Sequence, residues 1–521
     1  MFSRSTVPLF LLTGLALSIG WGIRGNFGHE FGALLPGALA AMTGVLLSGR
    51  ADWHSRVAWF GFLGALGWSF GGSMSYMQVI GYTHSGHSGS ILYGFASLFL
   101  IGFLWAALGG AGTALPALWN RRQLEALLPA LAAVAIAWGL QSFVEARLGR
   151  DAAFRHEDPL YWYDTDWLAA TTAPAAVLVM AAFRRRWDAG SSLVLHLAVG
   201  WWIGFLVLVN GLGLRMTPPR GDNWSGCLGM TLGLWIWLFH RGALPVLLAS
   251  MVSGFVGGFG FATAALMESV ELTSGLHTNW HSILEQTYGF LNGLGIALVF
   301  YLLRTRVRVV PEEASSSGWP RWVPAAFVGI VLPWLNLQRD PQDWTRSKAI
   351  PESLHGIPSE LWFHAAFALL AATILWVMVR SSSRSLELLP QSERGRGQAL
   401  LLFLLWFMVL GNLAKALPGF QAERLVTEGV IHVNALILTL GVVLVAAPSV
   451  EPLLQTVQWA VLVRRAAGIG VAGFALSVAA DWSVVRGIYG DRPTGARGTH
   501  IRFGPSATAT KARPKTGAPH P

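Results

Sequence analysis

Ionisable side chains interrupt the apolar sequence near residue 24. The segment from Gly20 to Pro36 places Arg24, His29 and Glu30 between two long apolar runs. A charged group in hydrocarbon costs roughly 2.5–3.5 kcal/mol on insertion scales, so such groups are usually paired, face a cavity or serve a function. An arginine at this position offers a planar fork that fits a carboxylate or a phosphate.

A similar arrangement returns 191 residues later in the chain. Arg215 again ends an apolar run, and an acid again stands six or seven residues after the arginine. The sequence therefore predicts an arginine–carboxylate pair within one segment or between the two. Two interpretations stay open, a site for an anionic ligand and an internal salt bridge that braces a re-entrant loop. The candidate substrate-binding residues of the two segments are Arg24, His29, Glu30, Arg215, Arg220 and Asp222.

Two pairs of histidines stand at corresponding positions, each just before an apolar run. The first pair is His84 and His87, and the second is His277 and His281. Glu285 follows His281 by four residues, which places both on one face of a helix. Imidazoles in such pairs can relay protons, contact a substrate or bind a metal ion, whereas the neighbouring Ser, Thr and Asn residues favour a hydrogen-bonded polar loop. We include these five residues among the candidate substrate-binding residues.

Three other polar groups are weaker candidates. Glu268 and Glu271 precede the second histidine pair, where they would act on an imidazole, bind a cation or lie on the surface. The loop 145–167 alternates acids with aromatic rings, a pattern found in sugar- or cation-binding edges and in the aromatic belt of membrane proteins. A polar rim is expected from Lys415, Glu423, Arg424 and Glu428.

No cofactor is expected, and no residue is assigned as a metal ligand. Cys227 is the only cysteine, which excludes an internal disulfide and a CxxC site. The chain contains no Walker motif, dinucleotide loop, nucleophile elbow or HExxH pattern, so neither ATP-driven work nor a standard hydrolase mechanism is supported.

The composition indicates a membrane protein. Of the 521 residues 53% are hydrophobic and only 12% are charged, and the mean hydropathy is +0.49. Apolar runs of roughly 17–25 residues, separated by short polar loops, are typical of membrane helices. The sequence predicts an all-α polytopic integral membrane protein with about fifteen transmembrane helices. They are expected at 6–23, 33–47, 57–80, 90–112, 124–144, 167–183, 193–214, 224–239, 243–267, 283–303, 322–337, 361–379, 399–417, 429–446 and 467–484.

Basic residues lie mainly in alternate loops, which explains the formal charge of +10 without nucleic acid as a partner. The positive-inside rule then places the amino terminus in the cytoplasm of a bacterial-type inner (plasma) membrane. The first apolar run lacks a small-x-small cleavage site and is expected to stay in the chain. With an odd number of helices, either the basic tail after Arg486 is translocated or a segment within 451–463 enters the membrane.

Four matches in the same order suggest an internal duplication. Besides the arginine segments, the glycine-rich run 61–68 matches 254–261, Tyr93-Gly-Phe95 matches Tyr288-Gly-Phe290, and 128–130 matches 323–325. Each copy holds six expected helices, so both copies enter the membrane in the same direction, as parallel repeats. The predicted domains are residues 1–190 (first repeat), 191–396 (second repeat), 397–488 (a partial third repeat) and 489–521 (a disordered basic tail). The glycines of the matched runs are expected to form helix contacts.

These features favour a secondary transporter, or permease, for a small anionic or hydroxylated solute, with an outward-facing polar site between the repeats. One alternative is a membrane-embedded transferase that acts on a lipid-linked substrate at the outer leaflet, because the polar clusters fall on one side. Another is a structural subunit of a membrane complex. The expected partners are membrane lipids and a small-molecule or lipid-linked substrate, and the sequence does not determine the oligomeric state.

Overall fold

The fold was analysed in a computed structural model, which describes residues 6–147, 166–216, 222–311, 319–383, 386, 389–419, 424–446, 449–452 and 456–489. The described chain is helical apart from one small hairpin, β1 (Ser353–Leu354) with β2 (Ile357–Pro358). The tail predicted at 489–521 lies outside the described residues except for Tyr489, as do Arg220, Glu423 and most of the loop 145–167.

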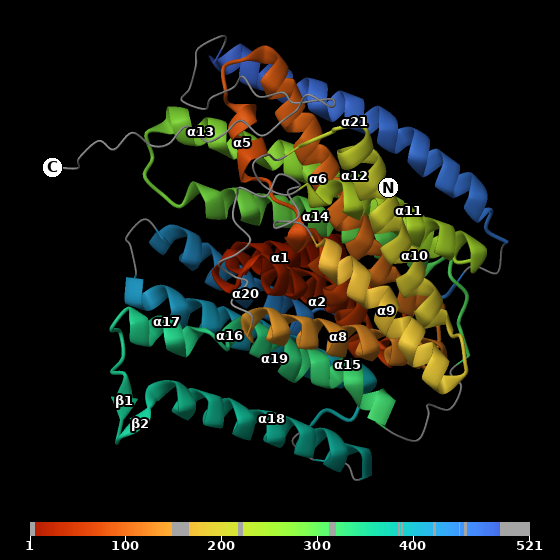
Figure 1. Ribbon diagram of the computed structural model, residues 1–521, viewed down its shortest axis with the longest axis vertical. Coiled ribbons are helices and arrows are strands. Elements are labelled where there is room, and N and C mark those ends of the chain that lie inside the picture. Colours follow the sequence, from red (N-terminus) through yellow and green to blue (C-terminus); the bar gives the residue numbers. More distant parts are fainter. Residues whose placement is uncertain are drawn as a thin grey trace.

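The described part of the first half of the chain is helical (Figure 1). They are α1 (Val7–Arg24), η1 (Gly25–Phe27), α2 (His29–Leu47), α3 (Ala51–His54), α4 (Val57–Ser69), η2 (Phe70–Ser73), α5 (Met77–Thr83), α6 (Ser88–Leu118), α7 (Arg121–Glu125), α8 (Leu128–Arg147), α9 (Trp167–Arg184), α10 (Ala189–Gly204), the π-helical η5 (Phe205–Gly211) and α11 (Asn223–His240).

The second half continues in the same way. Its elements are α12 (Leu244–Ala264), α13 (Leu266–Ser274), α14 (Trp280–Arg304), η6 (Trp319–Trp322), α15 (Val323–Ala326), the π-helical η7 (Phe327–Val331), α16 (Leu332–Leu337), α17 (Asp340–Arg346), α18 (Ser359–Ser383), α19 (Glu393–Ala416), η8 (Leu417–Gly419), α20 (Arg424–Leu444) and α21 (Trp459–Tyr489).

Every predicted apolar run is helical over most of its length, but only eleven helices in the described chain are long and apolar enough to cross a membrane. The predicted helix 57–80 breaks into α4, η2 and α5, and at the break Gly71 lies so close to Trp105 that a Cβ would overlap its ring. The run at 33–47 is shorter than a full span, and π-helical η7 interrupts the run at 322–337. The chain is thus a polytopic helical membrane protein.

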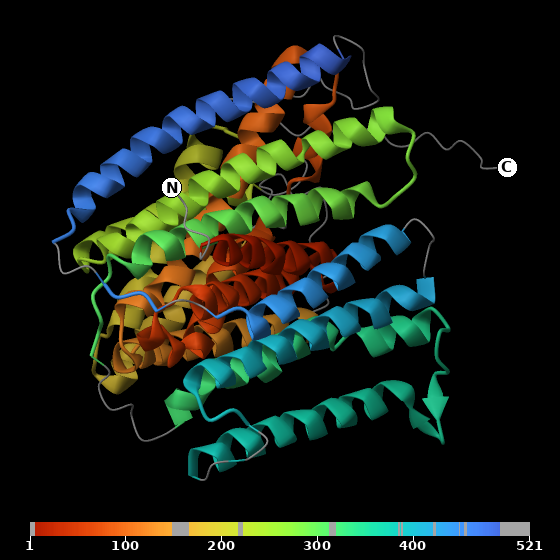
Figure 2. The same cartoon turned by 180° about the vertical axis from the view of Figure 1, so that it is seen from behind.

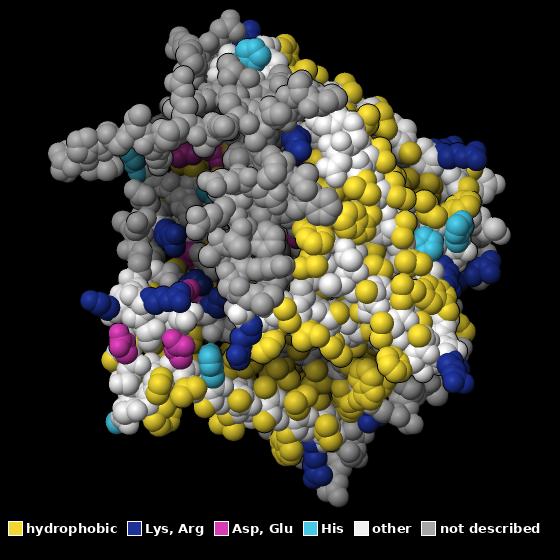
Figure 3. Space-filling view, viewed as in Figure 1, with side chains coloured by type: hydrophobic (Ala, Val, Ile, Leu, Met, Phe, Trp, Pro, Cys, Tyr) yellow, Lys and Arg dark blue, Asp and Glu magenta, His cyan; other side chains and the backbone are white. Residues whose placement is uncertain are grey.

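The long helices run side by side across the view, with α1, α2, α4, α6, α12 and α14 at the centre (Figures 1 and 2). One end of the bundle carries α5, α13, α17 and the hairpin, and we call it the α13 end. The opposite end carries the turns after α2, α6, α9, α11 and α14, and we call it the arginine end. Hydrophobic side chains cover much of the surface between the two ends, while basic side chains cluster toward them (Figure 3). This distribution suits a bundle surrounded by lipid.

The glycines of the two matched runs lie at helix contacts. A Cβ on Gly64 would come within 2.8 Å of α2, and one on Gly67 within 2.6 Å of the Leu108 carbonyl on α6. A Cβ on Gly257 would overlap that of Ala106 on α6. Small residues therefore let these helices approach closely, as predicted.

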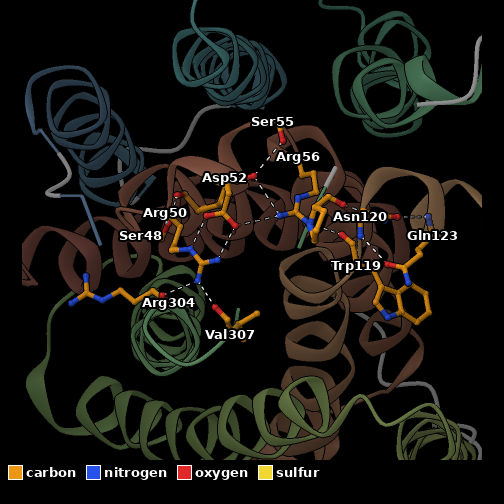
Figure 4. A network of polar contacts seen from close by, with 12 residues as sticks. Ser48, Arg50, Asp52, Ser55, Arg56, Trp119, Asn120, Gln123, Arg304 and Val307 are labelled. Atoms are coloured by element: carbon orange, nitrogen blue, oxygen red, sulfur yellow. Dashed lines mark hydrogen bonds and ion pairs between the residues drawn. The ribbon is translucent and has the colours of Figure 1, made fainter. Parts of the chain in front are cut away.

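At the arginine end, Arg50 joins two parts of the bundle (Figure 4). Its guanidinium binds both carboxylate oxygens of Asp52 at 2.7 Å. It also donates to the carbonyls of Arg304 and Val307, at 2.9 and 2.7 Å, where α14 ends. A cation at the carbonyl end of a helix satisfies acceptors that have no partner within the helix. Arg50 therefore fastens the turn after α2 to the end of α14.

Arg56 performs the same task for α6. Its guanidinium donates to the carbonyl of Trp119 at 2.6 Å, just after the last residue of α6 (Figure 4). Asn120 follows and caps α7 through a reciprocal pair of hydrogen bonds with Gln123. Arg56 thereby closes the end of α6, a structural role.

Candidate functional site

Arg24 is the last residue of α1, and its side chain is completely buried. The chain leaves the helix through the short turn η1 and then through Gly28, whose φ of +91° suits a residue without a Cβ. The turn brings the chain back into α2, so Arg24 lies at a helix end inside the bundle. The partial negative charge of that helix end favours a cation there.

Arg24 forms an ion pair with Glu285 of α14. The Nη2–Oε1 distance is 2.6 Å, and the two side chains are 1% and 4% exposed. The hydroxyl of Tyr76 lies 2.8 Å from both groups, accepting from Arg24 and donating to Glu285. Because Tyr76 stands between η2 and α5, three separate segments meet here. Arg24 is thus paired with the glutamate of the second histidine cluster, while the side chain of Glu30, the acid of its own segment, lies outside the described part.

Aromatic rings enclose the guanidinium of Arg24. Its Cζ lies 4.5 Å from the ring centre of Trp21 and 5.2 Å from that of Trp105. The Trp21 ring meets Tyr288 edge-on at 4.6 Å, and Tyr288 packs on Phe261. Cation–π attraction grows when the cation is removed from water. The ion pair therefore sits in an apolar enclosure, where the electrostatic interaction of its two charges is strong.

His281 connects the buried pair to the α13 end. Its Nε2 lies 3.5 Å from Oε1 of Glu285, one helical turn away, and its ring stacks on Tyr76 at an interplanar angle of 11°. The His281 side chain is 43% exposed, in contrast to the buried pair behind it. Glu268 of α13 interacts electrostatically with His281. Titratable groups therefore lead from the end of the bundle to Glu285.

The other predicted histidines lie apart from the ion pair. His87 caps α6, since its Nδ1 accepts from the backbone N–H of Ser90 at 3.2 Å. His277 is exposed in the turn before α14. His84 is partly buried between α5 and α6, where burial lowers the pKa of its imidazole against the opposing charge of Glu271. Of the four histidines, His281 is the one that contacts Glu285.

Arg215 pairs with the acid of its own segment. Its Nη1 lies 3.9 Å from Oδ2 of Asp222, whose other oxygen accepts from the backbone N–H of Met216 at 2.6 Å and from the Trp224 indole at 3.2 Å. This geometry braces the turn between η5 and α11. Arg24 and Arg215 therefore belong to different ion pairs. His29 begins α2, and the side chains of His29 and Glu30 lie outside the described part.

The helices α19 and α20 contribute polar groups beside the turn η1. Asn26, two residues after Arg24, donates to the Asn412 side chain of α19 at 2.5 Å. Asn412 in turn donates to Glu428 of α20 at 2.7 Å. The amide chain thus ties the turn after Arg24 to the third predicted segment of the protein.

Lys415 lies on the same side of η1 and binds two acids of α17. Its Nζ lies 2.8 Å from Asp340 and 3.1 Å from Asp343, and 5.8 Å from the ring centre of Phe27. The residues of the predicted polar rim therefore do not form one group, because Lys415 binds the acids of α17 while Glu428 binds Asn412. Neither Asp340 nor Asp343 was singled out from the sequence.

Tyr76, Trp21 and Trp105 were also missed, although they line the buried pair. A signal was available for Tyr76, because the sequence Gly71-Gly72 just before it interrupts an otherwise apolar run. A break inside a membrane helix exposes backbone groups that need partners, so polar side chains near it are worth testing. Trp21 and Trp105 could not be singled out from the sequence, because the chain contains 25 tryptophans.

From the buried carboxyl of Asp340 we expect the stability of the protein to depend on pH. Burial raises the pKa of its carboxyl to about 6 from 3.8, against the opposing effect of Lys415. The folded protein thus holds the proton of Asp340 more tightly than the unfolded chain does. The stability that this proton contributes is fully present below pH 3.8 and is lost as the pH rises through 6. Asp340→Asn removes this loss while Asp343 keeps its contact with Lys415. The melting temperature of the variant minus that of the wild type should rise by roughly 2 °C or more between pH 5 and pH 7. A constant difference would contradict the assignment.

The fold and the buried cluster define the class: a polytopic helical membrane protein with an enclosed ion pair where interrupted helices meet. Comparison with family models, with curated proteins and with solved structures finds no match to this chain. Among the described residues, no three His, Cys, Asp or Glu side chains are grouped so as to hold a metal ion.

Proposed function

We propose that this protein is a proton-coupled secondary transporter for a small anionic or hydroxylated solute. The observation that carries the proposal is the buried pair of Arg24 and Glu285, which is linked to the end of the bundle through the half-exposed His281. Removing two charges from water costs several kcal/mol per ion, and a well-packed apolar pair is often at least as stable. Ionisable groups at this depth commonly mark substrate and proton pathways.

The pair supplies a simple exchange mechanism. A proton that enters through His281 is transferred to Glu285 and neutralises its carboxylate, so the Arg24 guanidinium loses its counter-charge. The carboxylate or phosphate of a solute then takes the place of Glu285 on the arginine fork. Release of the solute on the opposite side of the membrane lets Glu285 lose its proton to that side and re-form the pair with Arg24. One solute and one proton thus move together, and neither charge of the protein stays unpaired in the apolar enclosure.

Interrupted helices support movement at this place. Arg24 stands where α1 gives way to η1, and Tyr76 follows the break between α4 and α5. Broken helices are characteristic of the binding sites of secondary transporters, because their ends present charges and can shift without unfolding the span. The π-helical segment η5 is a further irregularity of a kind that is frequent at functional sites.

We further propose the duplication and the topology inferred from the sequence. In each proposed repeat the first two long helices pack on each other, α1 with α2 and α10 with α11, and so do the later pairs, α4 with α6 and α12 with α14. This agreement in neighbours supports two parallel repeats. The basic turns of the arginine end support a cytoplasmic location for that end and for the amino terminus.

Reconstituted vesicles with an internal pH dye test this function. The purified protein is screened with a panel of small carboxylates, inorganic phosphate and hydroxylated solutes, and we expect at least one to drive proton movement. Glu285→Gln should lower that movement by roughly 100-fold, as for loss of a positioned proton-transfer group, while exchange of labelled solute persists. Glu352→Gln, an exposed glutamate of the same bundle end, is the control and should behave as wild type. Proton movement by Glu285→Gln at the wild-type rate would refute the mechanism, and no response to any solute in the wild type would favour a structural subunit.

A further inference from the structure

An apolar groove lies between α6, α12, α21 and the segment 214–216. Its volume is about 380 Å³. Tyr93, Ala96, Leu100 and Phe103 line it from one face of α6, at the three- and four-residue spacing of helix neighbours. The groove is continued by side chains of the other two helices, namely Phe255 of α12 and Val471 and Phe474 of α21.

The length of the groove matches one leaflet of a bilayer. From Tyr93 to Phe103 α6 advances ten residues, which is about 15 Å at 1.5 Å per residue. That distance is half of the roughly 30 Å of hydrocarbon in a typical bilayer. The groove thus begins near the α13 end and reaches the level of the bundle centre.

The volume of the groove distinguishes between a lipid chain and a helix of another protein as its occupant. The volume of the groove is about 380 Å³, whereas a ten-residue helix about 15 Å long and 10–12 Å across occupies on the order of 1,200–1,700 Å³. A helix with its side chains is about 10–12 Å across and does not fit. A single extended hydrocarbon chain, whose carbons contact their neighbours at about 4 Å, does fit. The groove is therefore suited to one acyl chain and not to a helix of a partner protein.

A cation stands at the mouth of this groove. Arg215 lines it and keeps 16% of its side chain exposed beside Asp222. The turn that carries Arg215 is held over the groove, since the Tyr93 hydroxyl lies 3.2 Å from the carbonyls of both Arg215 and Met216. A guanidinium at the end of a leaflet-deep apolar groove lies where the phosphate of a lipid would be, and its fork fits that group.

We propose that this groove binds one acyl chain of an anionic membrane phospholipid, with the lipid phosphate at Arg215. The site is independent of the ion pair of Arg24 and of the proposed transport. The acyl chain packs against the apolar faces of α6, α12 and α21, and van der Waals contact holds it there, because a lipid tail already lies outside water in the membrane. The charge at the mouth provides selectivity for an anionic headgroup.

Lipid retention measures this site directly. The protein is reconstituted in vesicles of equal phosphatidylglycerol and phosphatidylcholine, extracted in mild detergent, and its retained lipid is counted by native mass spectrometry. Wild type should retain phosphatidylglycerol about tenfold over phosphatidylcholine, equivalent to about 1.4 kcal/mol. Ala96→Trp and, on the opposite wall, Val471→Trp fill the groove and should lower that retention about tenfold. Arg215→Gln should keep a lipid but lose the preference between the two headgroups.

The matched control is Gly473→Trp, on the same helix as Val471 but with no other atom within 4 Å of a Cβ at that position. It should retain lipid as wild type does. Melting temperatures of all variants separate lost binding from lost folding, and the two groove-filling variants on different helices provide independent tests. Excess inorganic phosphate should not displace the lipid, because the acyl chain anchors it. Equal retention of both lipids by wild type, unchanged retention in both groove-filling variants, or a bound peptide in place of lipid would each overturn the proposal.

Discussion

Replacing Arg24 by methionine is expected to destabilise the protein by about 3–5 kcal/mol and to abolish transport. The substitution leaves the Glu285 carboxylate buried without Arg24, with only the Tyr76 hydroxyl and the half-exposed His281 beside it, and breaking a buried pair in this way costs more than the ion pair itself contributes. Thermal unfolding of the purified protein measures the first effect, and the vesicle assay measures the second.

The double variant Arg24→Met/Glu285→Gln separates structure from function. Both charges are then absent, while the amide oxygen of the introduced glutamine can still accept from Tyr76, so most of the lost stability should return. Transport should stay absent, because no group remains to bind the anion or to carry the proton. A double variant that is stable and fully active would assign the pair a purely structural role.

Arg184→Met is the matched control for the arginine. Arg184 pairs with Asp188 at 3.2 Å one helical turn away, but its side chain is 42% exposed. Exposed pairs of this kind contribute about 0.2–1 kcal/mol, so only a small change in stability and none in transport is expected. The difference between the stability losses of Arg24→Met and Arg184→Met measures how much burial adds to the cost of removing the arginine. Similar losses at both positions would mean that Arg24 is not enclosed as described.

Gly71→Ala is the second substitution with a large expected effect. An added Cβ would overlap the indole ring of Trp105, which donates to the Trp68 carbonyl at 2.8 Å and covers the guanidinium of Arg24. Either the break between α4 and α5 or the tryptophan must shift. Overpacking of this kind costs roughly 1–3 kcal/mol, and a larger loss is expected here because Trp105 is packed on all sides.

Gly81→Ala is the control for Gly71→Ala. Gly81 lies in α5, the helix that follows the break, and no other atom lies within 4 Å of a Cβ at this position. It should melt as wild type does or slightly higher, because alanine favours the helix α5. Comparing transport in the two variants tests whether Trp105 must stay over Arg24. If Gly71→Ala melts and transports as wild type does, then the close contact between η2 and α6 is not formed in the membrane.

The membrane class could be predicted from the sequence because hydropathy depends on composition within a local window. Runs such as 167–183 and 224–239 agree with α9 and α11 to within a residue or two. The break in the predicted helix 57–80 could not be found in this way. At the break Gly71 lies against Trp105 of α6, and a local window of sequence does not contain this contact between two helices.

For the candidate site, too, some features could be predicted from the sequence and others could not. Arg24 and Glu285 were identified from the sequence because ionisable residues are costly and rare in apolar runs. Their pairing was not, since the partners are 261 residues apart and local spacing favoured acids six or seven residues from each arginine. For Arg215 the local expectation holds, because Asp222 stays within the same turn.

Local hydropathy is enough to indicate that this chain crosses a membrane many times and which few side chains need a partner there. Both properties follow from the transfer free energies of individual residues and need no knowledge of neighbours. The folded arrangement was needed to see that Arg24 lies against Glu285 and Tyr76, that His281 connects this pair to the end of the bundle, and that Arg215 lines an apolar groove. Those arrangements arise from packing among helices distant in the chain, where the position of a glycine or a tryptophan on one helix sets the path of another.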